Sequence, residues 1–291
     1  MSVWFYKRKP YRVKARDYSL ELGERTAIMG ILNITPDSFS DKGRYFEPAA
    51  AIDRAWQIAE EGADILDIGG ESTRPGSSGI SADEEMKRVL PVLEALHKSG
   101  KYPIPISVDT SKGEVARAAL ERGAAIINDV TSLKNAPEIG SEAARWGAAL
   151  ILMHMRGEPK NMQLLPPSKD ILGEIDAWAR EVVVRALDSG IPRYSVILDP
   201  GIGFGKTADQ NAEILMNLDR LAAAGFPVLV GTSRKSFIGK IVNKPPDQLV
   251  MGTAATVALS ILSGAHIVRV HDVAAMREVA DVTDYLLEAG R

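Results

Sequence analysis

The chain has 291 residues, of which 45% are hydrophobic and 25% are charged, and its formal net charge is −3. These values are ordinary for a folded globular protein and exclude a disordered, collagen-like or membrane-embedded chain. The sequence has no run of Lys or Arg residues, so it does not predict a surface that binds nucleic acid or membranes. Cysteine is absent, which excludes disulfides, thiol catalysis and cysteine-based metal centres. The first residues lack the apolar stretch of a secretory signal, so we expect a cytoplasmic protein.

A short apolar run followed by a helical stretch recurs eight times along the chain. The runs are mainly apolar, as expected for strands buried on both faces of a parallel sheet. They span residues 27–32, 65–68, 104–108, 125–127, 150–153, 196–198, 228–230 and 267–270. The helical stretches end at glycines, which adopt the left-handed C-cap conformation easily; these are Gly62, Gly100, Gly123, Gly147, Gly190, Gly225, Gly264 and Gly290.

Eight such units predict a single (β/α)8 TIM barrel, an α/β fold, over residues 26–291. An open doubly wound sheet is the alternative. Residues 1–25 precede the first unit, and we expect a short N-terminal extension there, such as a hairpin that closes the barrel bottom. Two capping boxes, Ser81 with Glu84 and Ser111 with Glu114, predict helix starts.

Polar side chains follow the predicted strands, where the catalytic groups of such barrels lie. Asp109, Asn128 and Asp199 each come directly after an apolar run. Two carboxylates and a carboxamide around one pocket suit a planar heterocycle with an amino-amidine edge, because a carboxylate can accept paired N–H donors. Alternatively, each of these residues only caps a helix or ends a strand.

Basic residues near the last two predicted strands add hydrogen-bond donors. Arg269 and His271 lie two residues apart, so both project from one face of a strand, and Lys235 follows the preceding run. Together with the helix starts after these strands, they form a candidate phosphate clamp. A histidine with a purely structural role is the alternative for His271.

Residues 200–207, with the sequence PGIGFGKT, come close to a phosphate-binding P-loop. Proline replaces the leading glycine and no partner carboxylate is evident, so we reject a nucleotide-hydrolysing function. The glycines indicate instead that the backbone approaches a ligand closely, with Phe204 beside it.

Eight motifs lie in order at these strand ends, along nearly the whole chain. They are GILNITPDSFSD at 30–41, DIGGESTRPG at 67–76, SVDTSK at 107–112, IINDV at 126–130, MHMRGEP at 153–159, ILDPGIGFGK at 197–206, GTSRKSFIG at 231–239 and RVHDV at 269–273. Together they resemble the motifs of dihydropteroate synthases, the folate-pathway enzymes that join a pterin to 4-aminobenzoate. The chain departs from that family at Lys42 and at Ser132 and Leu133, all beside the motifs.

The resemblance implies a role for each matching residue. It implies a pterin site formed by Asp109, Asn128, Asp199, Lys235, Met153 and Gly231, in which Asp109 and Lys235 are catalytic. It implies a diphosphate site formed by Asn33, Thr73, Arg269 and His271, with Mg²⁺ held by Asn33. It implies a 4-aminobenzoate site formed by Arg74, Pro75, Phe204 and Ser236. It further implies a homodimer that binds sulfonamides, with closing loops at 33–44 and 71–80.

The implied reaction needs no protein nucleophile. Diphosphate leaves the pterin methylene, Asp109 stabilises the resulting cationic centre, and the arylamine attacks it. Water exclusion by the loops protects the cation. A pterin-dependent methyltransferase domain and a noncatalytic pterin-binding barrel are the alternatives, and the basic residues of the diphosphate site favour the synthase.

Overall fold

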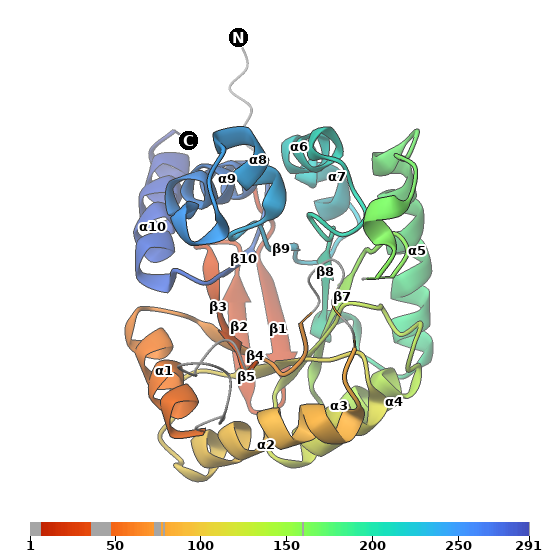
Figure 1. The fold of residues 1–291 in the computed structure, drawn as a ribbon, viewed down its shortest axis with the longest axis vertical. Coiled ribbons are helices and arrows are strands. Elements are labelled where there is room, and N and C mark those ends of the chain that lie inside the picture. Colours follow the sequence, from red (N-terminus) through yellow and green to blue (C-terminus); the bar gives the residue numbers. More distant parts are fainter. Residues whose placement is uncertain (1–6, 36–47, 73–76, 78, 159, 291) are drawn as a thin grey trace.

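The computed structural model describes residues 7–35, 48–72, 77, 79–158 and 160–290. Eight parallel strands lie at its centre and helices surround them (Figure 1). The strands are β3 (Ala27–Asn33), β4 (Ile65–Gly69), β5 (Ile106–Asp109), β6 (Ile126–Asp129), β7 (Ala149–Met153), β8 (Val196–Asp199), β9 (Leu229–Val230) and β10 (Ile267–Val270).

The strand order is β8-β7-β6-β5-β4-β3-β10-β9, and every neighbouring pair is parallel. A parallel bridge between Leu198 and Val228 joins the two outer strands, where the Leu198 amide donates to the Pro227 carbonyl oxygen at 3.0 Å. The sheet therefore closes on itself between β8 and β9. The predicted barrel is confirmed, and the alternative of an open sheet is wrong.

Helices follow the strands along the chain and cover the outside of the barrel. They are α1 (Pro48–Glu60), α2 (Ala82–Lys98), α3 (Gly113–Glu121), α4 (Glu138–Trp146), α5 (Ile171–Asp188), α6 (Ala208–Met216), α7 (Leu218–Ala222), α8 (Ser236–Val242), α9 (Val250–Leu262) and α10 (Val273–Ala289). In the described parts of the chain, no helix is both long enough and apolar enough to cross a bilayer.

The predicted helix ends are mostly where the glycines place them. All eight glycines except Gly290 have a positive φ. The Ser81 side chain caps α2 by accepting from the Glu84 amide. The predicted cap at Ser111 is wrong, because α3 begins at Gly113 after Lys112 and has no side-chain cap; the Thr110 hydroxyl instead accepts from the Lys112 amide at 3.2 Å.

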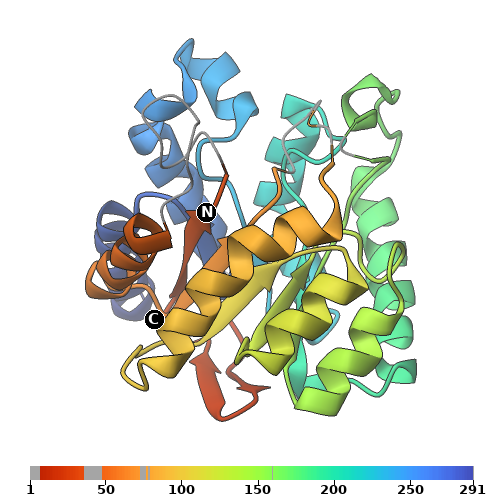
Figure 2. The ribbon, with the colours of Figure 1, turned by 60° about the horizontal axis from the view of Figure 1, so that its bottom comes forward.

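An antiparallel hairpin of β1 (Tyr11–Ala15) and β2 (Tyr18–Leu22) precedes the barrel. Figure 2 shows it at the end of the barrel opposite α8. Its Val13, Ala15 and Leu22 are buried in one cluster with the inward-facing apolar residues of the barrel, which include Met29 and Ile65. The hairpin thus covers the lower end of the barrel interior.

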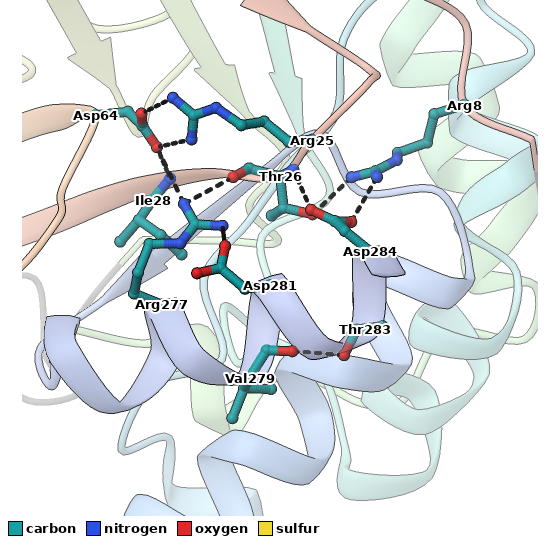
Figure 3. Close-up of polar contacts among 10 residues, drawn as sticks. All are labelled: Arg8, Arg25, Thr26, Ile28, Asp64, Arg277, Val279, Asp281, Thr283 and Asp284. Atoms are coloured by element: carbon teal, nitrogen blue, oxygen red, sulfur yellow. Dashed lines mark hydrogen bonds and ion pairs between the residues drawn. The ribbon is translucent and has the colours of Figure 1, made fainter. Parts of the chain in front are cut away.

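Charged side chains attach this N-terminal region to α10 (Figure 3). The Arg8 guanidinium donates to Thr26 Oγ1 at 2.6 Å, to the Ala265 carbonyl oxygen at 3.2 Å and to Asp284 Oδ1 at 2.6 Å. Nearby, Asp64 accepts from Arg25, from Arg277 and from the Ile28 amide. Because the Arg8 side chain is only 1% exposed, its charge depends on these partners.

We expect Arg8→Ala to lower the free energy of unfolding by about 3 kcal/mol, because it breaks a largely buried ion pair. The Asp284 carboxylate then keeps the hydrogen bonds from the amide and hydroxyl of Thr26 but loses its counter-charge. Urea denaturation measures the change. Arg12→Ala is the matched control: Arg12 pairs with Glu21 across the exposed hairpin, where the side chains are 67% and 62% exposed, and we expect a change within about 0.5 kcal/mol. Equal losses for both variants would contradict the anchoring role of Arg8.

Candidate active site

The inward face of the barrel changes from apolar to polar along each strand. Side chains alternate between the two faces of a strand, so Ile65, Asp67 and Gly69 of β4 share the interior, as do Ile267 and Arg269 of β10. The residues near the strand starts belong to the buried cluster under the barrel. Polar residues therefore gather at the carboxyl ends of the strands, where barrel active sites lie.

Four of these interior side chains form one hydrogen-bonded cluster. Arg269 donates from Nε to Asp67 Oδ2 at 2.6 Å and from Nη2 to Asp109 Oδ2 at 3.0 Å. Asn128 donates from Nδ2 to the same oxygen of Asp67 at 3.2 Å. The strand register sets this arrangement, because Asp109 lies beside Asn128 and Asp67 lies on the adjoining strand.

A second cluster lies around the loop after β8. The Asp199 carboxylate is buried and accepts from the Gly201 amide at 2.6 Å. Lys235 Nζ lies 4.1 Å from the centroid of the Phe204 ring, a cation–π contact. A Cβ atom at Gly203 would lie 3.2 Å from Lys235 Cδ, so glycine leaves room for the lysine side chain to cross the loop.

Burial governs the ionisation of these groups. Desolvation raises the pKa of Asp109 to about 7, although the Arg269 charge opposes the shift, and Asp67 repels the carboxylate further. Desolvation likewise raises the pKa of Asp199 to about 6, against the Gly201 hydrogen bond and the Lys235 charge. It lowers the pKa of Lys235 to about 8, with repulsion from Arg269. Shifted groups concentrated in one place are typical of a functional site.

Apolar side chains form a wall next to this polar ring. Met153 and Phe204 are buried in a small cluster with Val130 and Met162 that is separate from the main core. Met153 lies beside Asp199 in register. Gly231 lies next to Arg269, where a Cβ atom would be 3.7 Å from the Cβ atom of the arginine. A flat ring that meets polar groups at its edge suits such surroundings.

The remaining predicted residues lie at the rim. His271 Nδ1 is 3.0 Å from Ser233 Oγ, and the backbone amide of His271 donates to the same hydroxyl at 3.2 Å. Asn33 is half-buried at the end of β3, beside Gly69 in register. Ser236 is exposed at the start of α8 and lines a cavity of about 250 Å³ with Gly203 and other residues.

Several predicted positions lie outside the described residues. These are Thr73, Arg74 and Pro75, the segment from 36 to 44, which includes Lys42, and the central part of the loop 71–80. The structure places the predicted pterin-binding residues, all of which are described, at one barrel mouth. Arg269 here bonds to two carboxylates, so its contact with a diphosphate stays a prediction.

Lys206 holds the loop of residues 200–207 together through hydrogen bonds to backbone carbonyl groups. Its buried ammonium donates to the carbonyl oxygens of Gly201, Phe204 and His154 at 2.8, 3.1 and 3.1 Å. All three N–H donors are thus used inside the protein, which agrees with the rejection of a P-loop. His154, whose role the sequence leaves undecided, is buried edge-on against Trp178, and desolvation lowers its pKa to about 2.

We expect Gly201→Ala to lower the free energy of unfolding by well over 2 kcal/mol and to disturb the position of Phe204. Gly201 has a φ of +67°, and an added Cβ atom would lie 1.9 Å from the His154 carbonyl oxygen. Gly147→Ala separates backbone strain from steric collision, because Gly147 has a φ of +63° but an added Cβ atom there would meet no neighbouring group within 4 Å. This control should cost about 1–2 kcal/mol. Denaturation curves compare the two, and similar losses would argue against the collision.

Sequence reasoning missed Asp67 and the role of Lys206. Asp67 lies inside a run that was read as an apolar strand, yet it is fully buried and contacts both Asn128 and Arg269. The sequence feature that could have identified Asp67 is the alternation of side chains along β4, which puts this charged residue on the same face as Ile65. The departure at Ser132 and Leu133 is a turn in which both residues have a positive φ; buried Asp129 stabilises it by accepting from the amides of Thr131 and Leu133.

Comparisons with known proteins show the family to which the chain belongs. Residues 29–271 match the model of the family described as pterin binding enzymes. Dihydropteroate synthase from Synechocystis sp. is 49% identical over 91% of this chain and 91% of its own. Dihydropteroate synthase from Yersinia pestis, solved with a sulfonamide drug, superposes with a TM-score of 0.89 at 41% identity and covers 95% of this chain and 99% of its own.

The enzyme from Xanthomonas albilineans, solved with 4-aminobenzoic acid, has a TM-score of 0.87 at 40% identity and covers 96% of this chain and 98% of its own. Sequence and fold are thus shared over nearly the full length of these proteins. The polar ring found here lies within the matched residues. The chain belongs to the pterin binding enzymes and, among them, to the dihydropteroate synthases.

Proposed function

We propose that the barrel mouth condenses (7,8-dihydropterin-6-yl)methyl diphosphate with 4-aminobenzoate to give 7,8-dihydropteroate and diphosphate. The observation that carries this proposal is the gathering of Asp109, Asn128, Asp199 and Lys235 at one end of the barrel, in a chain 49% identical to a dihydropteroate synthase. The enzyme is then a transferase of the folate pathway.

The pterin ring would lie among these groups, beside the apolar wall formed by Met153 and Phe204. Its amino and ring N–H groups suit the carboxylate oxygens of Asp109 and Asp199, because an ionised carboxylate is a strong acceptor of paired donors. Lys235 supplies a donor for the carbonyl oxygen of the ring. Gly231, without a side chain, leaves space beside Arg269.

The diphosphate would lie toward Asn33, Arg269 and His271. In the described residues, no group of three or more acidic or histidine side chains could hold a metal ion. Mg²⁺ commonly keeps few protein ligands and completes its shell with phosphate oxygens and water, which fits the single carboxamide of Asn33. Such a bound ion would neutralise charge on the leaving diphosphate.

In the chemical step, the bond between the methylene carbon and the diphosphate oxygen breaks and the bonding electrons leave with the diphosphate. The Asp109 carboxylate stabilises the positive charge on the pterin side, and Arg269 stabilises the negative charge on the leaving group. The arylamine nitrogen then forms the new carbon–nitrogen bond and loses a proton. Ser236 and Phe204 lie on the side from which 4-aminobenzoate would approach.

We further propose that two copies of the chain associate through α10 and α9. Val282, Tyr285 and Leu286 of α10 are 61%, 70% and 60% exposed, and Met251 of α9 is 79% exposed. Subunit contacts commonly cover exposed apolar side chains of this size. Light scattering measures the mass in solution. The cytoplasmic location expected from the sequence stays a prediction.

The deciding experiment follows diphosphate release from purified protein with the pterin diphosphate and Mg²⁺, in the presence and absence of 4-aminobenzoate. We expect release that depends on the amine, together with formation of dihydropteroate. Binding of the pterin without turnover would identify a noncatalytic pterin-binding barrel instead. Methyl transfer from a methylated pterin, with no diphosphate release, would favour the methyltransferase alternative.

A further inference from the structure

Asp67 lies beneath the residues assigned to the ligand and is bonded to two of them. It is fully buried, and its Oδ2 accepts from Asn128 Nδ2 at 3.2 Å and from Arg269 Nε at 2.6 Å. Its Oδ1 has no hydrogen-bond partner among the described residues. Since the proposed reaction does not need Asp67 to touch a substrate, its buried charge calls for another explanation.

The first consequence concerns the carboxamide of Asn128. A carboxamide can rotate to exchange its donor and its acceptor, and both orientations fit the same space. An ionised carboxylate only accepts, so Asp67 selects the orientation in which Nδ2 faces the barrel interior. Asn128 Oδ1 is thereby turned away from Asp67 and is left as an acceptor for a donor on the ligand.

The second consequence concerns the guanidinium of Arg269. Asp67 bonds to Nε, the nitrogen nearest the backbone, and Asp109 bonds to Nη2. Two carboxylates thus fix the plane of the arginine side chain from different strands, β4 and β5. If Asp109 turns toward a ligand, the bond from Asp67 still holds the arginine in the barrel mouth.

We propose that Asp67 is a positioning residue, which fixes the carboxamide of Asn128 as an acceptor for a ring N–H and holds Arg269 in place for the leaving group. This inference rests on the proposed function, and it adds to that function a specificity for a ring that presents a donor to Asn128. Asp67 acts through its two partners and does not touch the substrate.

The test uses Asp67→Asn, which keeps the shape and removes the charge, and Asp67→Ser as a second variant if the first does not fold. An asparagine can also donate, so the Asn128 carboxamide is no longer held in one orientation. We expect kcat/KM to fall about 10–100-fold, the size typical of partners that orient a ligand-binding residue. Asp284→Asn is the control, because it removes a buried ion-pair partner at the other end of the barrel.

The side-chain amide signal of Asn128 in nitrogen-15 spectra of the free protein provides a readout that is independent of turnover. Asn128→Ser identifies the signal by its loss. We expect this signal to move in both Asp67 variants and to stay in place in Asp284→Asn. A signal and a kcat/KM that match those of the wild type in folded Asp67→Asn would overturn the proposal. Wild-type protein without amine-dependent release would instead defeat the proposed function, and the spectra would still test the orientation.

Discussion

Asp109→Asn is expected to leave a folded protein that has lost most of its turnover, with kcat reduced about 10²–10³-fold, as for loss of one group aimed at a developing charge. The carboxylate lies at the end of β5 and accepts from Arg269 at 3.0 Å. Asparagine keeps the shape but brings no negative charge to the pterin methylene when the diphosphate leaves. Steady-state and single-turnover kinetics, measured with saturating 4-aminobenzoate, report the loss.

The fold should tolerate this change, and the direction of the pKa shift explains why. Burial raises the pKa of Asp109 to about 7, so below that pH the native state binds a proton that the unfolded chain releases near the ordinary pKa of an aspartate. The stability associated with that proton is present below the ordinary pKa and is lost as pH rises toward 7. Asparagine cannot ionise, so the stability of the variant should fall less than that of the wild type between pH 4 and pH 7.

Asp64→Asn, at the lower end of the barrel, is the control for the kinetic measurements on Asp109→Asn. Unchanged kcat in Asp109→Asn would remove Asp109 from the mechanism.

Arg269→Ala should have the largest effect on stability of any substitution in the site, about 3–5 kcal/mol. The guanidinium balances both Asp67 and Asp109, and Asp67 is fully buried. Its removal leaves two carboxylates facing each other in the barrel interior. Urea denaturation at pH 7.5 gives the change in unfolding free energy, and calorimetry with the diphosphate substrate and with free pterin compares binding.

Two comparisons make this prediction specific. Lowering the pH protonates Asp109, whose pKa burial raises to about 7, so the difference in unfolding free energy between Arg269→Ala and wild type should shrink as the pH falls from 7.5 toward 5. Arg269→Lys keeps the charge without the planar fork, and it should recover much of the stability but little of the diphosphate affinity. If alanine weakened free pterin and the diphosphate substrate equally, the assignment of Arg269 to the leaving group would be wrong.

Periodic features of the fold could be predicted from the sequence because they depend on local burial. All eight predicted runs form strands, but some observed strand ends differ from the predicted ones for reasons that lie in the backbone. The run at 104–108 begins as a strand only at Ile106, since Pro105 has no N–H to donate and only its carbonyl enters the ladder. The polar ring could be predicted in the same way, because the ends of parallel strands meet at one edge.

Contacts between distant residues could not be predicted. The pairing of Asp67 with Arg269 spans 202 positions in the sequence, and nothing local at either residue names its partner. The glycine-rich loop shows the same limit, since Lys206 looks like a phosphate ligand until its three bonds to backbone carbonyls are seen. The reaction could be predicted only from the ordered motifs, because a fold alone does not determine the chemistry of its site.

The hairpin under the barrel packs its apolar side chains against the lower end of the barrel interior. With Val13, Ala15 and Leu22 packed at the lower end, Asp67 and Arg269 lie between an apolar cluster and the barrel mouth, and a planar substrate bound at the mouth would cover them. Ligand binding would then displace water from the neighbourhood of these charges. Since charge interactions strengthen as water is excluded, substrate binding would itself strengthen the electrostatic field at the reacting carbon.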